Sequence, residues 1–197
     1  MEKGQNSNRP AKGSTIKVDP IKKVKDIKSI KTLLKDKPRD LCLFTMGINT
    51  NLRASDLLGI SVSMVKDLKS GDELTLKEHK TGKHRRITLN KAVVSSIQAL
   101  LTINDYQDNQ PLFTGQRGPL TVPSINRLVK GWCSAINLKG NYGSHTLRKT
   151  FGYHQRVTFG RGVPELMVVF NHSSQRETLE YLCIQPDEVK SIYLNEL

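Results

Sequence analysis

The sequence predicts an α+β domain that is mostly α-helical and contains one small antiparallel β-sheet. Apolar residues recur every three or four positions along most of the 197-residue chain, which is the spacing of amphipathic helices. Strict alternation of apolar and polar residues occurs only in "DELTLKEHKTGKHRRITLN", residues 72–90. Helices and strands do not alternate along the chain, so a parallel sheet is not expected. The length suits one domain with flanking segments.

The pattern of the first third of the chain predicts a basic arm followed by helices. Residues 1–20 are polar and basic, and we expect a disordered arm there. Apolar positions from Ile21 to Leu34 predict an amphipathic helix that ends before Pro38. "RDLCLFTMG" predicts a mostly buried helix that stops at Gly47, and "ASDLLGI" predicts a short helix after a loop.

The only strand signal predicts a β-hairpin. Leu74 and Leu76 alternate with polar neighbours, and Ile87 and Leu89 do so again after "KTGK". The turn should therefore be centred near Gly82.

Helical patterns return after the hairpin. Apolar spacing predicts helices at about 91–102, at 122–136 and from His145 onward. Pro164 suits the first turn of a further helix. The capping-box sequence "SQRE" predicts that a last helix begins at Gln175.

The charge balance indicates a polyanionic partner. The chain has 31 Lys and Arg against 18 Asp and Glu, a net charge of +13, which favours nucleic acid over a generic solubility charge. Cys42, Cys133 and Cys183 are widely separated, which argues against a disulfide framework and a zinc site and fits a reducing cytoplasm. No apolar run approaches the roughly 18–20 residues that would cross a bilayer.

The segment "SHTLR" combines groups that suit an anion. With Ser144 as the expected N-cap, His145 lies in the first helical turn and Arg148 lies on the same face. Backbone N–H groups at a helix start add their own attraction for a phosphate. The alternative is that His145 is an ordinary helix-start residue and Arg148 a solvated charge.

The segment "NHSSQRETLEYLCI" places a histidine and a tyrosine on either side of a helix break. His172 follows one helix, and Tyr181 lies nine residues later in the next. The break allows both side chains to approach one site, although Tyr181 as a core residue is the simpler alternative. Three other tyrosines lack a histidine upstream at such a break: Tyr142, Tyr153 and Tyr193.

Two further segments carry cations in loops. Arg53 in "NLRASD" precedes a short helix, and Asp56 could brace its guanidinium. The hairpin turn carries Lys80 and Lys83. Taken alone, each of these two segments is more typical of an ordinary exposed surface than of a functional site.

Taken in order, "NLRASDLLGI", "HKTGKHRRITL", "HTLR" and "NHSSQRETLEYL" resemble the catalytic domain of the tyrosine recombinases, the phage integrase family. The resemblance covers about residues 38–185 and implies a catalytic domain at 38–197, after an arm at 1–20 and a helix or linker at 21–37. Asn171 replaces the glycine usual in the family, and Asp56 stands where glutamate is common. The 38 or so residues before this region are too few for the core-binding domain that most relatives carry. The chain is therefore expected to be either a minimal member of the family or the C-terminal portion of a longer protein.

The resemblance implies a role for each matching residue. Tyr181 would attack a DNA phosphate, forming a 3′-phosphotyrosine bond and freeing a 5′-hydroxyl without ATP, metal or other cofactor. Arg53 and Arg148 would bind the non-bridging oxygens, and His145 would act as the base. Asp56 would support Arg53.

The remaining implied roles concern proton donation and DNA contacts. Lys80 would protonate the leaving 5′-oxygen, with Lys83 as the alternative, and His172 would donate a hydrogen bond to the phosphate. We expect four residues to contact DNA: Lys83, Arg85, Arg86 and Lys149.

The resemblance also implies partners and a cellular location, and alternative functions remain beside it. We expect a homotetramer on double-stranded DNA, with a monomer in solution left open, no membrane association, and a cytoplasmic, nucleoid-associated protein of prokaryotic or phage origin. The segment "DEVKSIYLNEL", with Val189, Ile192 and Tyr193, would dock on a neighbouring subunit or on its own core. The alternatives are a non-catalytic DNA-binding module, a metal-dependent nuclease and a type IB topoisomerase.

Overall fold

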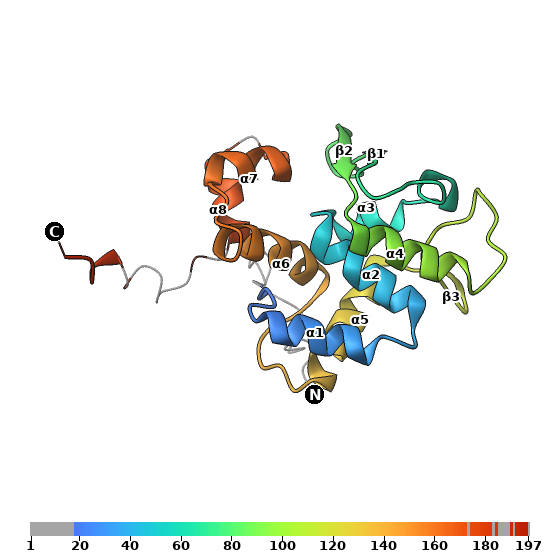
Figure 1. The fold of residues 1–197 in the computed structure, drawn as a ribbon, viewed down its shortest axis with the longest axis horizontal. Helices are drawn as coiled ribbons and strands as arrows, with labels where there is room; N and C mark the ends of the chain where they lie inside the picture. Colours follow the sequence, from blue (N-terminus) through green and yellow to red (C-terminus); the bar gives the residue numbers. More distant parts are fainter. Residues whose placement is uncertain (1–17, 173, 183, 185–189, 191, 197) are drawn as a thin grey trace, which may run out of the picture.

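Helix α2 (Pro38–Asn49) lies at the centre of the fold. The structure is a computed structural model that describes residues 18–172, 174–182, 184, 190 and 192–196. Helix α2 packs against α4 (Lys91–Leu101) and α6 (Ser144–Val157), as Figure 1 shows. The other elements are α1 (Val24–Leu33), α3 (Ala54–Leu58), a 3₁₀ turn (Val62–Met64), β1 (Glu73–Lys77), β2 (His84–Thr88), β3 (Thr114–Gly115), β4 (Gly118–Pro119), α5 (Val122–Ala135), α7 (Val163–Phe170) and α8 (Gln175–Leu182). The predicted class, mostly helical with a small antiparallel sheet, is confirmed.

Helix α2 continues through Gly47, so the prediction that it stops there is wrong. The glycine is explained by packing instead. A Cβ atom at position 47 would lie 2.5 Å from Cδ1 of Leu147 on α6. The missing side chain therefore lets the two helices approach closely, which outweighs the intrinsic cost of a glycine inside a helix.

Strands β1 and β2 form the predicted hairpin. Leu74 pairs with Ile87 in antiparallel register, and both side chains are buried. Gly82 in the turn has φ +68°, a conformation that glycine adopts without strain. A second, very short ladder of β3 and β4 was not predicted, because two-residue strands give no alternation.

The segment ahead of α2 packs into the same core as the rest of the domain. Ile21, Ile30 and Leu34 are fully buried. The backbone N–H of Ile21 donates to Oγ1 of Thr150 on α6 at 2.9 Å. The segment at 21–37, expected as a helix or linker, contains α1 and packs into this core, whereas residues 1–17 of the expected arm lie outside the described residues.

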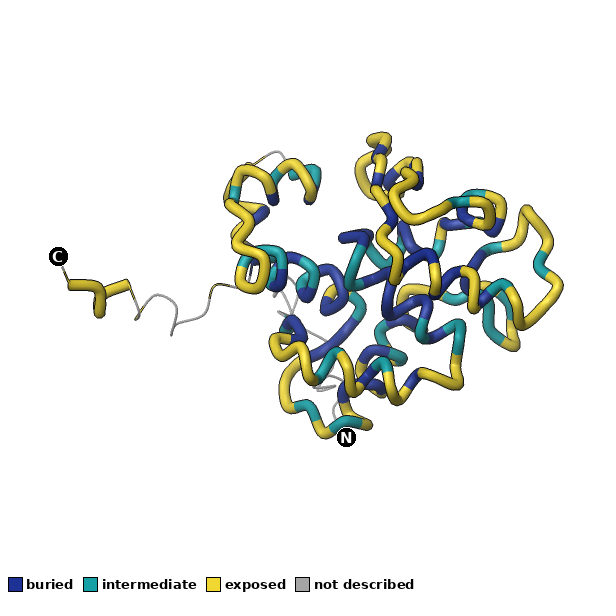
Figure 2. Tube along the Cα trace, viewed as in Figure 1, coloured by how far each residue is buried: buried dark blue, intermediate teal, exposed yellow. Residues whose placement is uncertain are grey.

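Helices α7 and α8 form a small unit with its own core against α6. Leu166, Phe170 and Leu182 are its buried residues, with Tyr181 packed beside them. Figure 2 shows that most of this unit is exposed, in contrast to the buried centre around α2. Of the predicted C-terminal docking residues, Val189 lies outside the described residues, while Ile192 and Tyr193 are exposed. Within the part of the chain that the structure describes, no helix has the length and apolarity to cross a lipid bilayer.

Candidate active site

The turn between α7 and α8 brings His172 back toward α6. Asn171 has φ 55° and ψ 39°, the left-handed conformation that often ends a helix. The His172 N–H then bonds the carbonyl of Met167 at 3.1 Å. Asparagine tolerates this conformation better than most non-glycine residues, so Asn171 replaces the expected glycine at modest cost. Helix α8 begins at Gln175 as predicted, with Ser174 Oγ accepting the Glu177 N–H.

The rings of His172 and Tyr181 lie side by side. Their centroids are 5.3 Å apart, and Phe170 lies 5.4 Å from the Tyr181 ring. The ring of His145 lies 6.5 Å from Tyr181. The helix break therefore brings the three predicted residues of two distant segments into one cluster.

Arg148 lies beneath this cluster with unused hydrogen-bond donors. The residue is only 1% exposed, and its Nη2 donates to the carbonyl of Phe170 at 3.1 Å. Among the described residues, Nε and Nη1 find no acceptor, although buried polar atoms are normally paired. Burial, followed by the like charge of Arg53, lowers the pKa of Arg148 to about 10, so it stays cationic at neutral pH. A buried cation with unused donors is suited to bind an anion.

The start of α6 differs by one residue from the expectation. Ser144 is the first helical residue rather than the N-cap, which is Gly143. The side-chain oxygen of Thr146 accepts the Gly143 N–H at 3.0 Å. His145 still lies in the first turn, where backbone N–H groups favour an anion.

Arg53 is held by two carboxylates, the expected Asp56 and, in addition, Glu78. Its Nη1 lies 3.0 Å from Oε2 of Glu78 and 3.8 Å from Oδ2 of Asp56. Asp56 also accepts the backbone N–H of His79 at 2.9 Å, which ties α3 to the hairpin loop. Glu78 was missed, although it continues the inward register of Leu74 and Leu76.

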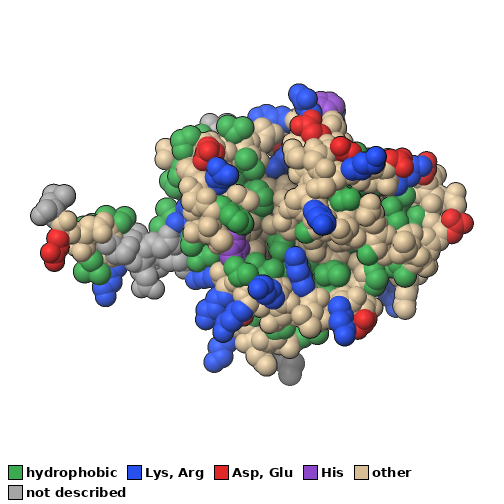
Figure 3. Space-filling model, in the orientation of Figure 1, with side chains coloured by type: hydrophobic (Ala, Val, Ile, Leu, Met, Phe, Trp, Pro, Cys, Tyr) green, Lys and Arg blue, Asp and Glu red, His purple; other side chains and the backbone are tan. Residues whose placement is uncertain are grey.

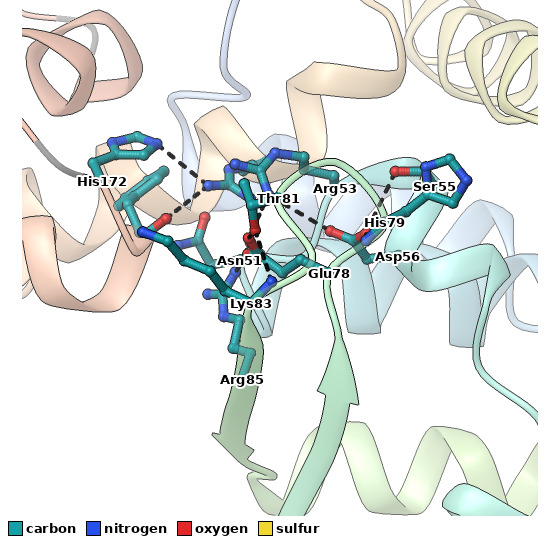
Figure 4. Close-up of polar contacts among 12 residues, drawn as sticks. Asn51, Arg53, Ser55, Asp56, Glu78, His79, Thr81, Lys83, Arg85 and His172 are labelled. Atoms are coloured by element: carbon teal, nitrogen blue, oxygen red, sulfur yellow. Dashed lines mark hydrogen bonds and ion pairs between the residues drawn. The ribbon is translucent and has the colours of Figure 1, made fainter.

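Arg85, which we expected to contact DNA, is buried. It is 8% exposed, and its Nη1 lies 3.1 Å from Oε1 of Glu78. Its Nη2 donates to the carbonyl of Val169 at 2.7 Å. Figure 4 shows Arg53 and Arg85 on either side of Glu78. The side chain of Arg85 points inward because it lies on the same face of β2 as Ile87. Through its bond to Val169, Arg85 connects the hairpin to the C-terminal end of α7.

The lysines of the hairpin loop remain at the surface. Lys80 and Lys83 are exposed. The flanking backbone is held in place because Thr81 Oγ1 donates to Oε2 of Glu78 at 2.7 Å. Of the other expected DNA contacts, Arg86 is exposed and pairs with Glu73 at 3.7 Å, and Lys149 is half-buried.

Burial and the surrounding positive charges lower the pKa of both histidines, which keeps them neutral. Desolvation, and then the charges of Arg148, Lys149, Arg53 and Lys80, lowers the pKa of His145. Burial, and then Arg148, lowers the pKa of His172 to about 4. Neutral imidazoles can accept protons, as a general base must.

The described residues contain no group of three or more His, Cys, Asp or Glu side chains that could hold a metal ion. The cluster consists instead of cations, imidazoles and one phenol, a donor set suited to phosphate.

A comparison with family models identifies the family of the chain. The model of the phage integrase family matches residues 22–188. The chain belongs to the phage integrase family. It is 35% identical over 181 residues to "Probable integrase/recombinase YoeC" of Bacillus subtilis strain 168, covering 89% of this chain and 95% of that protein.

Other relatives are less similar in sequence. Tyrosine recombinase XerC of Caldanaerobacter subterraneus subsp. tengcongensis is 28% identical over 159 residues, which cover 78% of this chain and 44% of XerC. The chain thus spans less than half of that relative. These relatives are named as a probable integrase/recombinase and as a tyrosine recombinase.

Solved structures share the fold at low sequence identity. The crystal structure of XerA recombinase has a TM-score of 0.74 and 18% identity, covering 96% of this chain and 66% of that one. XerH site-specific recombinase, in a post-cleavage complex with its palindromic difH substrate, has a TM-score of 0.72 and 18% identity, covering 92% of this chain and 55% of XerH.

Proposed function

We propose that this member of the phage integrase family is a site-specific DNA recombinase that cuts and rejoins DNA through Tyr181. The phenolic oxygen attacks a scissile phosphate, forming a 3′-phosphotyrosine bond as the bond to the 5′-oxygen breaks. The reverse attack by another 5′-hydroxyl restores the phosphodiester bond, so the strand is rejoined without ATP.

The single observation that carries this proposal is the position of Arg148. Its Nε and Nη1 donors lie buried without an acceptor among the described residues, and its guanidinium lies 5.2 Å from the Tyr181 ring. A phosphate held by these donors would be within reach of the tyrosine. Preorganised donors at such a site typically contribute ~10²–10³ in rate.

The other roles follow from position and charge. Arg53 lies close enough to Arg148 to lower its pKa, which supports joint binding of one phosphate by the two guanidinium groups. His145, kept neutral by its surroundings, accepts the phenolic proton. Glu78 and Asp56 hold Arg53 in place.

Lys80 is our choice for the residue that protonates the leaving 5′-oxygen. It is among the charges that lower the pKa of His145, which supports its proximity to the site. Two flanking contacts, from His79 and Thr81, fix the loop that carries it. Lys83 remains the alternative.

The proposed partner is double-stranded DNA, on which four copies act on two duplexes. The net charge of +13 supports a polyanionic partner. Figure 3 shows Lys and Arg side chains gathered near α1 on one face, and exposed lysines lie within residues 22–28. We further propose that the protein acts in the cytoplasm, where DNA is accessible.

A covalent-capture experiment tests the function. The protein is incubated with genomic DNA, and fragments that remain bound in SDS are sequenced to locate the target. A nicked duplex of that target is then used to trap the intermediate. We expect an SDS-resistant adduct with the wild type and none with Tyr181→Phe. An adduct of equal yield with Tyr181→Phe would contradict the assigned nucleophile, and no adduct with the wild type would favour a non-catalytic DNA-binding module.

A further inference from the structure

The hydroxyl of Thr178 faces the imidazole of His172. Thr178 lies on α8, one turn before Tyr181, and its side chain is completely buried. Its Oγ1 lies 3.1 Å from Nδ1 of His172. The other ring nitrogen, Nε2, lies 3.4 Å from Nη2 of Arg148. The ring is thus held between α8 and α6.

These two contacts define the tautomer of the resting ring. A guanidinium group can only donate hydrogen bonds, so Nε2 must accept from Arg148. The ring proton therefore resides on Nδ1, which donates to Oγ1 of Thr178. Burial, followed by the charge of Arg148, lowers the pKa of His172 to about 4, so a second proton is absent at neutral pH.

This tautomer is unsuited to the bound phosphate. A lone pair on Nε2 would repel an anionic oxygen, whereas the hydrogen bond to the phosphate that the family resemblance implies for His172 needs a proton on Nε2. A hydroxyl can both donate and accept, so Thr178 can rotate to donate to an unprotonated Nδ1. The ring then carries its proton on Nε2 without becoming charged.

We propose that Thr178 is a positioning residue that supports both tautomers of His172, so that Nε2 changes from an acceptor of the Arg148 N–H to a donor toward the scissile phosphate. Solvent takes the proton from Nδ1 and returns one to Nε2, so the net charge is unchanged. The phosphate-bound state rests on the proposed function, but the resting tautomer is a property of the protein alone.

Nuclear magnetic resonance of protein labelled with ¹⁵N in its histidines tests the tautomers directly. We expect His172 to carry its proton on Nδ1 in the wild-type protein at neutral pH, and on Nε2 at the end of a titration with inorganic phosphate. A proton on Nε2 without phosphate would overturn the resting assignment. An Nε2 that stays unprotonated throughout the titration would overturn the switch. Neither measurement requires a variant to fold.

Two substitutions test the role of the hydroxyl in the reaction. Thr178→Val keeps the branched shape and removes the hydroxyl, whereas Thr178→Ser keeps the hydroxyl. We expect Thr178→Val to slow single-turnover adduct formation by ~10-fold, the worth of one hydrogen bond, and Thr178→Ser to restore most of the rate. Thr75→Val, at an exposed threonine of β1, is the matched control.

The outcomes separate this inference from the proposed function. Equal rates for Thr178→Val and the wild type would contradict the role of Thr178. Equal losses in the valine and serine variants would show that packing, rather than the hydroxyl, matters, and would also contradict it. A wild-type protein that forms no DNA adduct would refute the proposed function, while the tautomer of the resting ring would still be measured.

Discussion

The guanidinium carbon of Arg148 lies 5.2 Å from the centroid of the Tyr181 ring and 5.1 Å from that of Phe170. The arginine belongs to α6 and the tyrosine to α8, so their distance depends on how the two helices pack. Gly152 of α6 permits this packing, because a Cβ atom there would lie 2.8 Å from the Phe170 ring. The proposed nucleophile and the proposed phosphate-binding donors are therefore positioned by the same small core.

The planar guanidinium group of Arg148 should be essential for adduct formation, and a positive charge alone should not replace it. Lysine lacks the planar pair of donors, so Arg148→Lys should slow single-turnover adduct formation by ~10²–10³. Arg117→Lys, at an exposed arginine between β3 and β4, should react at the wild-type rate. A rate for Arg148→Lys within a few-fold of the wild type would show that charge alone suffices.

Glu78 should stabilise the fold through its two arginines. Burial alone would raise its pKa, but the hydrogen bond from Thr81 and the charges of Arg53 and Arg85 hold that pKa below its ordinary value. Removing one partner of such a buried network typically costs ~3–5 kcal/mol, so Glu78→Gln should lower the free energy of unfolding in urea by about 3 kcal/mol.

The matched control for Glu78 is Glu73, at the start of the strand β1 that precedes it. Glu73 is exposed and lies 3.7 Å from Arg86, so Glu73→Gln should change the free energy of unfolding by less than ~0.5 kcal/mol. Similar losses for the two variants would contradict the structural role of Glu78.

His172 should make the fold less stable in mild acid. Its pKa is lowered to about 4 by burial and by Arg148, with Arg53 adding to this effect and Glu177 and Glu78 opposing it. The unfolded chain takes up this proton near pH 6.5, before the folded protein does, so stability is full above that pH and declines toward pH 4. Urea unfolding from pH 7 to pH 4 should show a smaller decline for His172→Gln. Identical declines would contradict the lowered pKa.

Lys80 should be required for protonation of the leaving oxygen. Lys80→Ala should slow cleavage of an ordinary substrate by ~10²–10⁴. A substrate with a 5′-bridging phosphorothiolate, whose sulfur leaves without a proton, should restore cleavage by Lys80→Ala. Restoration for Lys83→Ala alone would reassign the role to Lys83.

The elements that follow local patterns could be predicted from the sequence. The hairpin follows from alternation, and the break before Gln175 follows from a capping box, so the pairing of His172 with Tyr181 was foreseeable. Local patterns also indicate the start of α6 to within one residue.

The interactions between distant segments could not be predicted in the same way. Glu78 and Arg85 continue the inward register of their strands, but a charged residue at a strand end is usually solvated. Their burial depends on Arg53 and Val169, which come from other parts of the chain. The role of Gly47 could not be predicted for the same reason, because its partner Leu147 is contributed by another helix.

The site of covalent attachment tests the central claim most directly. The DNA adduct is digested with nuclease and trypsin, and the modified peptide is identified by mass spectrometry. Cleavage after Arg176 and Lys190 releases "ETLEYLCIQPDEVK", in which Tyr181 is the sole tyrosine. We expect the residual nucleotide on this peptide, attached to Tyr181. A nucleotide on a peptide that contains one of the other four tyrosines, Tyr106, Tyr142, Tyr153 or Tyr193, would contradict the account.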